Sequence, residues 1–364
     1  LNGHVLVRHL VCFISAENIA FNINDVVHHL HFCNKVWQAV RFFLSATDKC
    51  SEASAGMLII DIGEMSQENL STIDRWILSC LAYTVESCNE HLEHGDLHQY
   101  LSSAQHFLVQ KFCDVYLESV KPTVWSGDRK HLLPTCNVMA TVVQTAIRLL
   151  APVMPHLAEE LHQRLAVLFR VPRPESICIT PYPASQQWQP WKNAELQHDV
   201  ARVLEVVSAL RSVKKFCGIK KPAAYVVIKD DGDKVKLGEL APMVQHLSWM
   251  GDLQVVAYPD WKGPPEERAW SPATVNSSID IYVETDIAKL REVMSERVQR
   301  LAVKLHNLET KVSNQQYIKR ATKVEKDKHE KEISELRTEL DKLQDQKLEM
   351  QGGHNLSHTL YSPS

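Results

Sequence analysis

Apolar residues recur every three or four positions from about residue 25 to residue 170, and this periodicity predicts a bundle of amphipathic helices. The widest apolar stripe belongs to the first helix and comprises Phe32, Cys33, Val36, Trp37, Val40, Phe43 and Leu44. A second stripe follows Ser71, which stands three residues before Asp74, close to the pattern of a capping box. Gly95 is expected to end this second helix, and Asp96 is placed to cap the third.

Prolines set the later boundaries of the bundle. The third helix is expected to stop at Pro122, and a fourth runs from about Pro134 to Leu150. After two further prolines the segment LAEELHQRL resumes the apolar pattern as a fifth helix. We therefore assign residues 21–170 to one helical domain, preceded by a segment at 1–20 that matches no pattern.

Residues 171–284 mix helix and strand patterns. The proline-rich connection up to Trp191 has room for one short strand, and a helix from about Ala194 to Phe216 ends at Gly218. Three runs, AAYVVIK, LQVVAY and SIDIYVE, have the composition of strands and surround a short helix near Leu240. This pattern predicts a linker followed by a small α+β subdomain.

Residues 285–351 repeat apolar positions in steps of three and four on two helices, interrupted by SNQQYIKRATKVEKDK. A single parallel coiled coil would need the repeat to continue through residues 313–325, which it does not. The pattern therefore favours an antiparallel coiled-coil hairpin, followed by a tail at 352–364 that we expect to be disordered. The predicted fold class is mainly α: a helical bundle, a small α+β subdomain and a coiled-coil hairpin.

Composition narrows the class of protein. The 364 residues carry a net charge of −4, so a claim of nucleic-acid binding must rest on local clusters. Nine scattered cysteines without a C-x-x-C pair argue against a disulfide framework and favour a reducing, cytoplasmic compartment. The opening LNGHVLVRHLVCFI is too short and too interrupted for a membrane span and lacks the features of a signal peptide, so no membrane partner is expected.

The sequence contains no motif of a self-contained active site. Cys33 lies on the apolar stripe, which is typical of a buried structural thiol. His91, His94 and His98 have spacings that a metal ion could use, but Gly95 divides them at a helix end. Glycine-rich phosphate loops, a nucleophile elbow and an H-E-x-x-H pair are absent. We predict no catalytic residue, cofactor site or metal site in this chain.

Three polar clusters carry the functional signal. The polar side of the first helix presents Asn34, Lys35, Gln38 and Arg41. Lysines bracket Gly218, namely Lys214, Lys215, Lys220 and Lys221. Basic residues also gather toward the turn of the predicted hairpin: Arg297, Arg300, Lys304, Lys311, Lys319, Arg320 and Lys323. Glu309 is the only acid in that last stretch, so its charge suits a phosphate backbone. The alternatives are a protein partner and a solvated coiled-coil surface.

Five segments resemble the valyl-tRNA synthetases, a family of class I aminoacyl-tRNA synthetases. HFCNKVWQAVRF resembles the F-x-N-K-x-W-N-A-x-R-F segment that opens the anticodon-binding helical domain of that family. IDRWILSCL, DVYLESVKP, LAPVMPHLAEELHQRL and SICITPYP resemble its following segments in the same order, over about residues 21–183. The terminal hairpin favours the valyl enzymes over the isoleucyl ones, which often end in zinc modules.

The resemblance implies the C-terminal portion of a valine–tRNA ligase. Such a parent enzyme would attach valine to tRNA(Val) with ATP and Mg²⁺, and Asn34, Lys35, Gln38 and Arg41 would face the anticodon end. Gln38 stands where the family has asparagine, and the His-Ile-Gly-His and Lys-Met-Ser-Lys-Ser signatures are missing, as are the nucleotide-binding fold and the editing domain. We therefore expect the chain alone to be inactive. The parent could be cytosolic or mitochondrial.

Two alternatives stay open at this point. The chain could be a non-catalytic tRNA-binding protein derived from such an enzyme, or a coiled-coil scaffold protein. Other synthetases or translation factors are further candidate partners.

Overall fold

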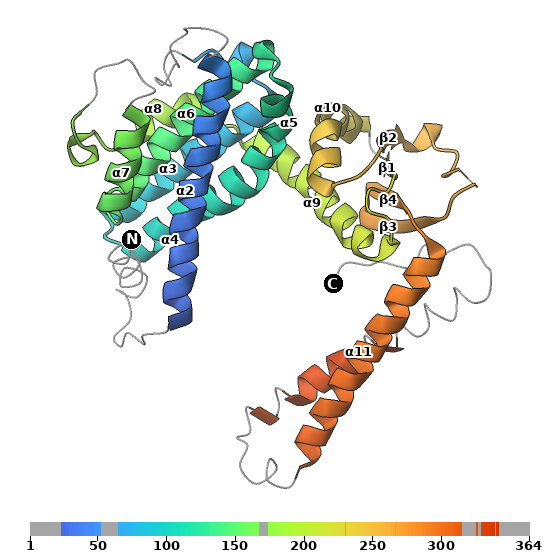
Figure 1. Ribbon diagram of the computed structural model, residues 1–364. Helices are drawn as coiled ribbons and strands as arrows, with labels where there is room; N and C mark the ends of the chain where they lie inside the picture. Colours follow the sequence, from blue (N-terminus) through green and yellow to red (C-terminus); the bar gives the residue numbers. More distant parts are fainter. Residues whose placement is uncertain are drawn as a thin grey trace. The chain divides into compact units, whose positions relative to one another are not determined.

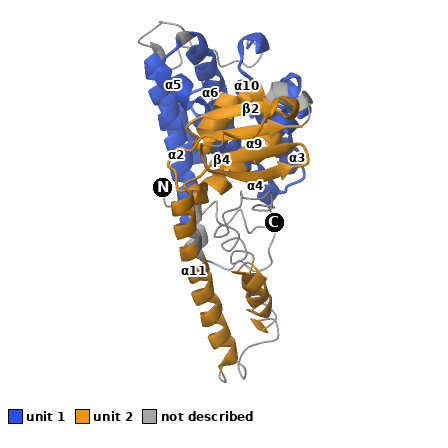
Figure 2. Ribbon diagram, turned by 90° about the vertical axis from the view of Figure 1, so that its right-hand side faces the viewer, with its two compact units in different colours: residues 1–200 blue, residues 201–364 orange. Residues whose placement is uncertain are grey.

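The computed structural model describes residues 23–51, 65–166, 174–229, 231–265, 267–314, 325–326, 329–338 and 340–341. They form two compact units, residues 1–200 and 201–364 (Figures 1 and 2). The segment 1–20 and the tail expected at 352–364 lie outside the described residues.

The first unit is a helical bundle. Its main elements are α2 (Ile23–Ser51), α3 (Thr72–Glu93), α4 (Leu97–His106), the π-helical segment η3 (Phe107–Leu117), α5 (Glu118–Ser126), α6 (Arg129–Leu150) and α7 (Pro155–Ala166). Shorter turns are η2 (Gln67–Asn69), η4 (Ile177–Ile179), α8 (Ser185–Trp188) and η5 (Gln189–Trp191). Helix α6 packs against α2, α3 and α7, and large side chains such as Phe43, Trp76, Tyr100 and Tyr116 fill the core. The predicted helical bundle is confirmed.

Side-chain caps fix the starts of α3 and α4. The Ser71 side chain accepts a hydrogen bond from the backbone N–H of Asp74, whose carboxylate accepts from the backbone N–H of Ser71, so the capping box is complete. Asp96 accepts from the N–H of Gln99 at 3.0 Å and caps α4. Gly95, with φ of 73°, supplies the left-handed backbone between the two helices.

Two predicted boundaries in the bundle are wrong. The helix does not stop at Pro122: α5 continues through it and ends at Gly127, which has φ of 66°. Val120 and Val124 are buried on either side of the proline, and this burial offsets the missing backbone hydrogen bond. Helix α6 starts five residues before Pro134, because the Asp128 side chain caps it by accepting from the N–H of Lys130.

The prediction of a short strand in the proline-rich connection is also wrong for the described part of that connection. Residues 174–191 form helical turns and no strand. The Glu159 carboxylate accepts hydrogen bonds at 2.8 Å from the N–H of Ile177 and from the Ser176 hydroxyl. Because Glu159 on α7 already accepts the hydrogen bond from the Ile177 N–H, this N–H does not need an acceptor on a neighbouring strand.

The second unit contains a four-stranded sheet with the strand order β2-β1-β4-β3. Its elements are the end of α9 (Ala194–Cys217), β1 (Ala224–Ile228), α10 (Asp231–Ser248), β2 (Leu253–Ala257), η6 (Tyr258–Asp260), β3 (Trp270–Asn276) and β4 (Ile279–Glu284). Strands β1 and β2 are parallel, and α10 connects them and packs against both. Strand β4 pairs antiparallel with β1 and with β3. The predicted α+β part is thereby confirmed.

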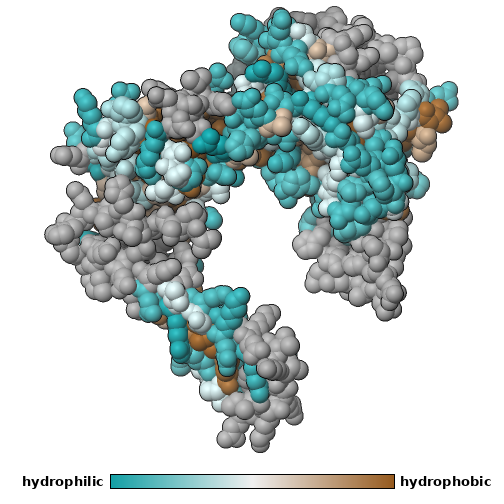
Figure 3. Space-filling view, turned by 180° about the vertical axis from the view of Figure 1, so that it is seen from behind, coloured by the Kyte–Doolittle hydropathy of each residue, from teal (hydrophilic) through white to brown (hydrophobic). Residues whose placement is uncertain are grey.

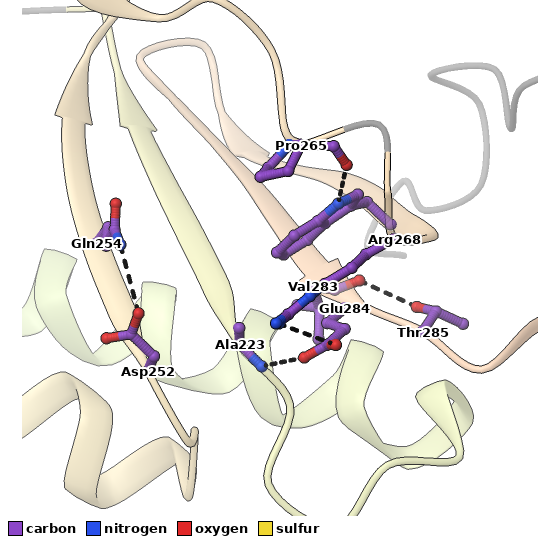
Figure 4. Close-up of polar contacts among 9 residues, drawn as sticks. Ala223, Asp252, Gln254, Pro265, Arg268, Val283, Glu284 and Thr285 are labelled. Atoms are coloured by element: carbon purple, nitrogen blue, oxygen red, sulfur yellow. Dashed lines mark hydrogen bonds and ion pairs between the residues drawn. The ribbon is translucent and has the colours of Figure 1, made fainter.

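Strand β3 was not predicted because Pro272 interrupts its sequence pattern. The structure places β3 at the edge of the sheet, where a proline does not break an interior ladder. Figure 4 shows polar contacts at the ends of three strands: the carboxylate of Glu284, at the end of β4, accepts from the N–H of Ala223 ahead of β1 at 3.0 Å and pairs with Arg268 ahead of β3 at 3.2 Å. The indole of Trp270 donates to the carbonyl of Pro265 at 3.0 Å.

Helix α11 (Ile287–Ser313) follows the sheet, and residues 329–338 form a second helical segment. Lys311, near the end of α11, contacts His329 at 3.4 Å, whereas Lys304, two turns earlier, pairs with Glu332 at 2.9 Å. The two segments therefore run antiparallel, as expected for a hairpin. Figure 3 shows that the described surface seen from behind is mostly hydrophilic, with apolar residues confined to small patches.

Candidate nucleic-acid interface

Helix α2 separates its apolar and polar residues onto two sides, as its sequence pattern predicts. Phe32, Cys33 and Val36 are buried in the bundle. Four residues make up the polar side, which we call the α2 strip: Asn34, Lys35, Gln38 and Arg41. Asn34 and Lys35 are adjacent, and Gln38 and Arg41 follow at intervals of about one turn. Three of them are exposed and Lys35 is half-buried. The helix thus holds amide and cationic groups at its surface, where they can reach a partner.

Specific contacts orient the α2 strip. The Nζ atom of Lys35 lies 2.7 Å from Oδ1 of Asp114 on η3. Arg41 donates through Nη1 to Oε1 of Gln38 at 3.4 Å, one turn away on the same helix. The side chain of Lys35 is 38% exposed and that of Asp114 is 53% exposed, so water screens their attraction. Asp114 is a functional candidate that the sequence pattern did not single out.

Trp37 stands beside the α2 strip and is half-buried. The guanidinium carbon of Arg164 on α7 lies 4.9 Å from the centre of its ring, within the range of a cation–π contact. The same guanidinium pairs with Glu160 at 2.8 Å. Arg164 therefore adds a second cation close to α2, from a helix distant in the sequence.

The first unit also has an open groove of about 480 Å³ beside α3 and α4. Tyr83, Ser87, Ser103, His106 and Lys111 are among the residues that line it. Burial and the nearby Lys111 ammonium lower the pKa of His106, which favours the neutral imidazole. Hydroxyl, imidazole and ammonium groups together can bind a ribose or a phosphate by hydrogen bonds. No sequence motif marked this groove, because its residues come from four elements: α3, α4, η3 and α9.

The lysines around Gly218 lie in the second unit. Lys214 and Lys215 occupy the last turn of α9, and Gly218, with φ of 72°, ends the helix as predicted. The Nζ atom of Lys214 donates to the backbone carbonyl of Trp249 at 2.7 Å. The other three lysines of this cluster are exposed: Lys215, Lys220 and Lys221. Lys215 lies in the last turn of α9, and Lys220 and Lys221 lie in the connection from α9 to β1.

The hairpin cluster is less positive than its sequence suggests. Arg300 pairs with Glu296 at 2.9 Å, and Lys304 pairs with Glu332 of the second segment at 2.9 Å. Lys311 lies beside His329. Arg297 belongs to α11, and three further members lie outside the described residues: Lys319, Arg320 and Lys323. When the second segment folds back on α11, it brings acidic residues such as Glu332 next to the basic residues of α11. A count of charges along residues 297–323 does not include these acids.

The described part of the chain contains no cluster of metal ligands, and three of its thiols have strongly raised pKa values. Its described residues include no group of three or more His, Cys, Asp or Glu side chains that could hold a metal ion. Burial raises the pKa of the Cys80, Cys88 and Cys113 thiols to about 12, so these thiols are protonated near neutral pH. Among the described helices, none is long and apolar enough to cross a membrane.

Comparison with known proteins agrees with this picture. Residues 74–228 match the family model described as the anticodon-binding domain of tRNA ligase. The mitochondrial valine–tRNA ligase of Sus scrofa is 31% identical over 73% of this chain and 24% of its own length. That of Rattus norvegicus is 29% identical over 91% of the chain and 30% of its length, and the valine–tRNA ligase of Takifugu rubripes is 28% identical over 94% and 28%.

The chain spans less than a third of the length of the curated relatives it matches. The alignments to the rat and pufferfish proteins cover nearly all of it, including both compact units. The chain therefore belongs to the valine–tRNA ligase family and corresponds to the C-terminal portion with the anticodon-binding domain.

Proposed function

We propose that this chain binds tRNA, and specifically tRNA(Val), as the tRNA-reading part of a valine–tRNA ligase. The observation that carries the proposal is the match of residues 74–228 to the anticodon-binding domain of tRNA ligases. The relatives named as valine–tRNA ligases support valine as the identity of the tRNA.

In this proposal the α2 strip faces the anticodon end. Its amide and guanidinium groups can donate hydrogen bonds to the exposed edges of unpaired bases, which is the usual way in which proteins read single-stranded RNA. The exposure of Asn34, Gln38 and Arg41 supports this role. The lysines around Gly218 and the hairpin cluster would contact phosphates, which adds affinity without reading sequence.

The parent enzyme would join valine to tRNA(Val) with ATP and Mg²⁺. The described residues do not fit either group, because they contain neither a cluster of metal ligands nor a phosphate-binding loop. We therefore derive no step through ATP or Mg²⁺ for this chain and assign to it binding and orientation of the tRNA only.

Fluorescence anisotropy with the purified chain tests the proposal. We expect a labelled tRNA(Val) transcript to bind with an affinity that falls steeply with salt, because binding releases counterions from phosphates. A transcript with an altered anticodon should bind more weakly at every salt concentration. Equal affinity for both transcripts would reject anticodon reading, and no salt-dependent binding of either would reject the proposed function in favour of a scaffold role.

A further inference from the structure

Trp249, immediately after α10, combines two unusual properties. Its side chain is 64% exposed, although it is the largest apolar side chain in the repertoire. Its φ is 60°, and it is the only residue other than glycine with a positive φ in the described part of the chain. This position after a helix is normally taken by glycine, because a Cβ atom is strained in the left-handed region.

The backbone around Trp249 is held by a closed set of hydrogen bonds. The N–H of Trp249 donates to the carbonyl of His246 at 3.2 Å, and the N–H of Met250 donates to that of Gln245 at 3.1 Å. The Nζ atom of Lys214 donates to the carbonyl of Trp249 itself at 2.7 Å. The indole is thus presented to solvent from a fixed base rather than from a loose loop.

Cationic residues lie at the backbone of this corner. Arg211 donates through Nε to the carbonyl of Leu247 at 2.8 Å, two residues before Trp249. Gly251 donates its N–H to the carbonyl of Pro222, which places Lys221 beside the same corner. The pKa of Lys214 is lowered, chiefly by burial and to a smaller extent by the nearby Lys221 ammonium. Two ammonium groups close together have this effect on each other. Residues 211–221 include five basic residues and no acid.

A purely structural role explains only part of this arrangement. Arg211 and Lys214 satisfy carbonyls at the C-terminal end of α10, where cations are favourable. That role requires no aromatic side chain at residue 249, and glycine would fit the backbone without strain. An exposed aromatic ring whose backbone is contacted by cationic side chains is instead a combination suited to single-stranded nucleic acid, since a ring can stack on a base while cations contact its phosphates.

We propose that Trp249 is a stacking site for an unpaired RNA base, with Lys214 and Lys221 contacting the adjacent phosphates. The proposal rests on the proposed tRNA-binding function and adds to it a contact in the α+β unit, apart from the α2 strip. It requires an unpaired base, so a loop or a single-stranded end of RNA is the ligand, and a continuous duplex is not.

The test compares variants at residue 249 with two labelled RNA probes, a tRNA(Val) transcript and a blunt RNA duplex. Trp249→Gly removes the ring and the backbone strain together, and Trp249→Asn removes the ring while keeping a residue that tolerates this backbone. We expect both variants to unfold at no lower temperature than the wild type. Their affinity for the transcript should fall by about fivefold to a hundredfold, while their affinity for the duplex stays the same.

The matched control is Tyr258→Ala, which removes an aromatic side chain that is 59% exposed in the same unit. It should leave both affinities unchanged. If the wild type binds the transcript and both variants at residue 249 bind it equally well, the stacking site is rejected while the tRNA-binding function stands. An equal loss for transcript and duplex would also reject stacking. A wild type that binds neither probe would reject the proposed function, and the stacking site with it.

Discussion

The Nζ atom of Lys35 on α2 lies 2.7 Å from the Oδ1 atom of Asp114 on the π-helical segment η3. This contact joins the α2 strip to a part of the bundle that lies 79 residues away in the sequence. It also places a carboxylate beside the cation that we expect to approach RNA, so Asp114 opposes an incoming phosphate.

Replacement of Asp114 by asparagine should therefore strengthen tRNA binding. It removes one repulsive charge and frees Lys35 for a phosphate, which should steepen the dependence of log affinity on log salt by about one. Both side chains of the pair are more than one third exposed, so the free energy of unfolding should change by less than about 1 kcal/mol. Anisotropy titrations at several salt concentrations check this.

The matched control is the double variant Asp114→Asn with Lys35→Ala, which should lose the steeper slope. If Asp114→Asn weakens binding, Asp114 itself contacts the RNA or positions the α2 strip, and the repulsion argument is wrong.

Two aromatic residues on α2 should differ in their effect on stability. Phe43 is fully buried, so Phe43→Ala should lower the free energy of unfolding by about 3–5 kcal/mol. Trp37 is half-buried beneath Arg164, so Trp37→Ala should cost less, about 1–2 kcal/mol. Urea denaturation followed by circular dichroism measures both. A cost for Trp37→Ala as large as that for Phe43→Ala would mean that the ring is a core residue.

Asp74 predicts a pH dependence of stability. Its carboxyl is buried, accepts from Tyr116 at 2.6 Å, and has a pKa raised above 3.8 chiefly by that burial. Because the pKa of Asp74 is raised in the folded protein, its protonated carboxyl stabilises the fold. This contribution is complete below pH 3.8 and is lost as the pH rises through the raised pKa.

Asp74→Asn removes this titration, so the stability of the wild type relative to this variant should be greatest at acid pH and should decline as the pH rises. Urea denaturation of both proteins over a series of pH values provides the difference. A relative stability that grows with pH would show that the hydrogen bonds to Asp74 outweigh its burial.

The hairpin cluster should bind tRNA without reading its sequence. Replacement of all seven basic residues by glutamine should reduce the affinity for different tRNAs by the same factor. These residues are Arg297, Arg300, Lys304, Lys311, Lys319, Arg320 and Lys323. Each lost phosphate contact should reduce the salt slope by about one. Because Arg300 and Lys304 already pair with acids, their single replacements should have smaller effects than Lys311→Gln. An unchanged salt slope in the sevenfold variant would identify the cluster as a solvated surface.

Local signals in the sequence predicted much of the fold. Ser71 with Asp74, Asp96, Gly95 and Gly218 mark helix ends through short-range hydrogen bonds and backbone preferences, and the structure has each of them. The continuation of α5 through Pro122 and the presence of strand β3 were not predicted, because both depend on tertiary structure. The burial of Val124 and the edge position of Pro272 are tertiary facts that override a local rule.

The candidate interface was only partly predictable for the same reason. The α2 strip could be identified because helical spacing alone places its members on one side. Only folding brings Asp114 to Lys35, Arg164 to the ring of Trp37, and the carbonyl of Trp249 to Lys214. The sequence carries no signal for those encounters. The pairing of Lys304 with Glu332 likewise depends on the chain folding back.

The central claim is that the α2 strip reads the anticodon end of tRNA(Val), and one measurement tests it most directly. The affinities of the wild type and of the double variant Lys35→Ala, Arg41→Ala are compared for a tRNA(Val) transcript and for one with an altered anticodon. We predict that the wild type prefers the valine anticodon, and that the variant loses this preference while its thermal unfolding stays nearly unchanged. A preference that survives both substitutions, in a variant as stable as the wild type, would contradict the claim.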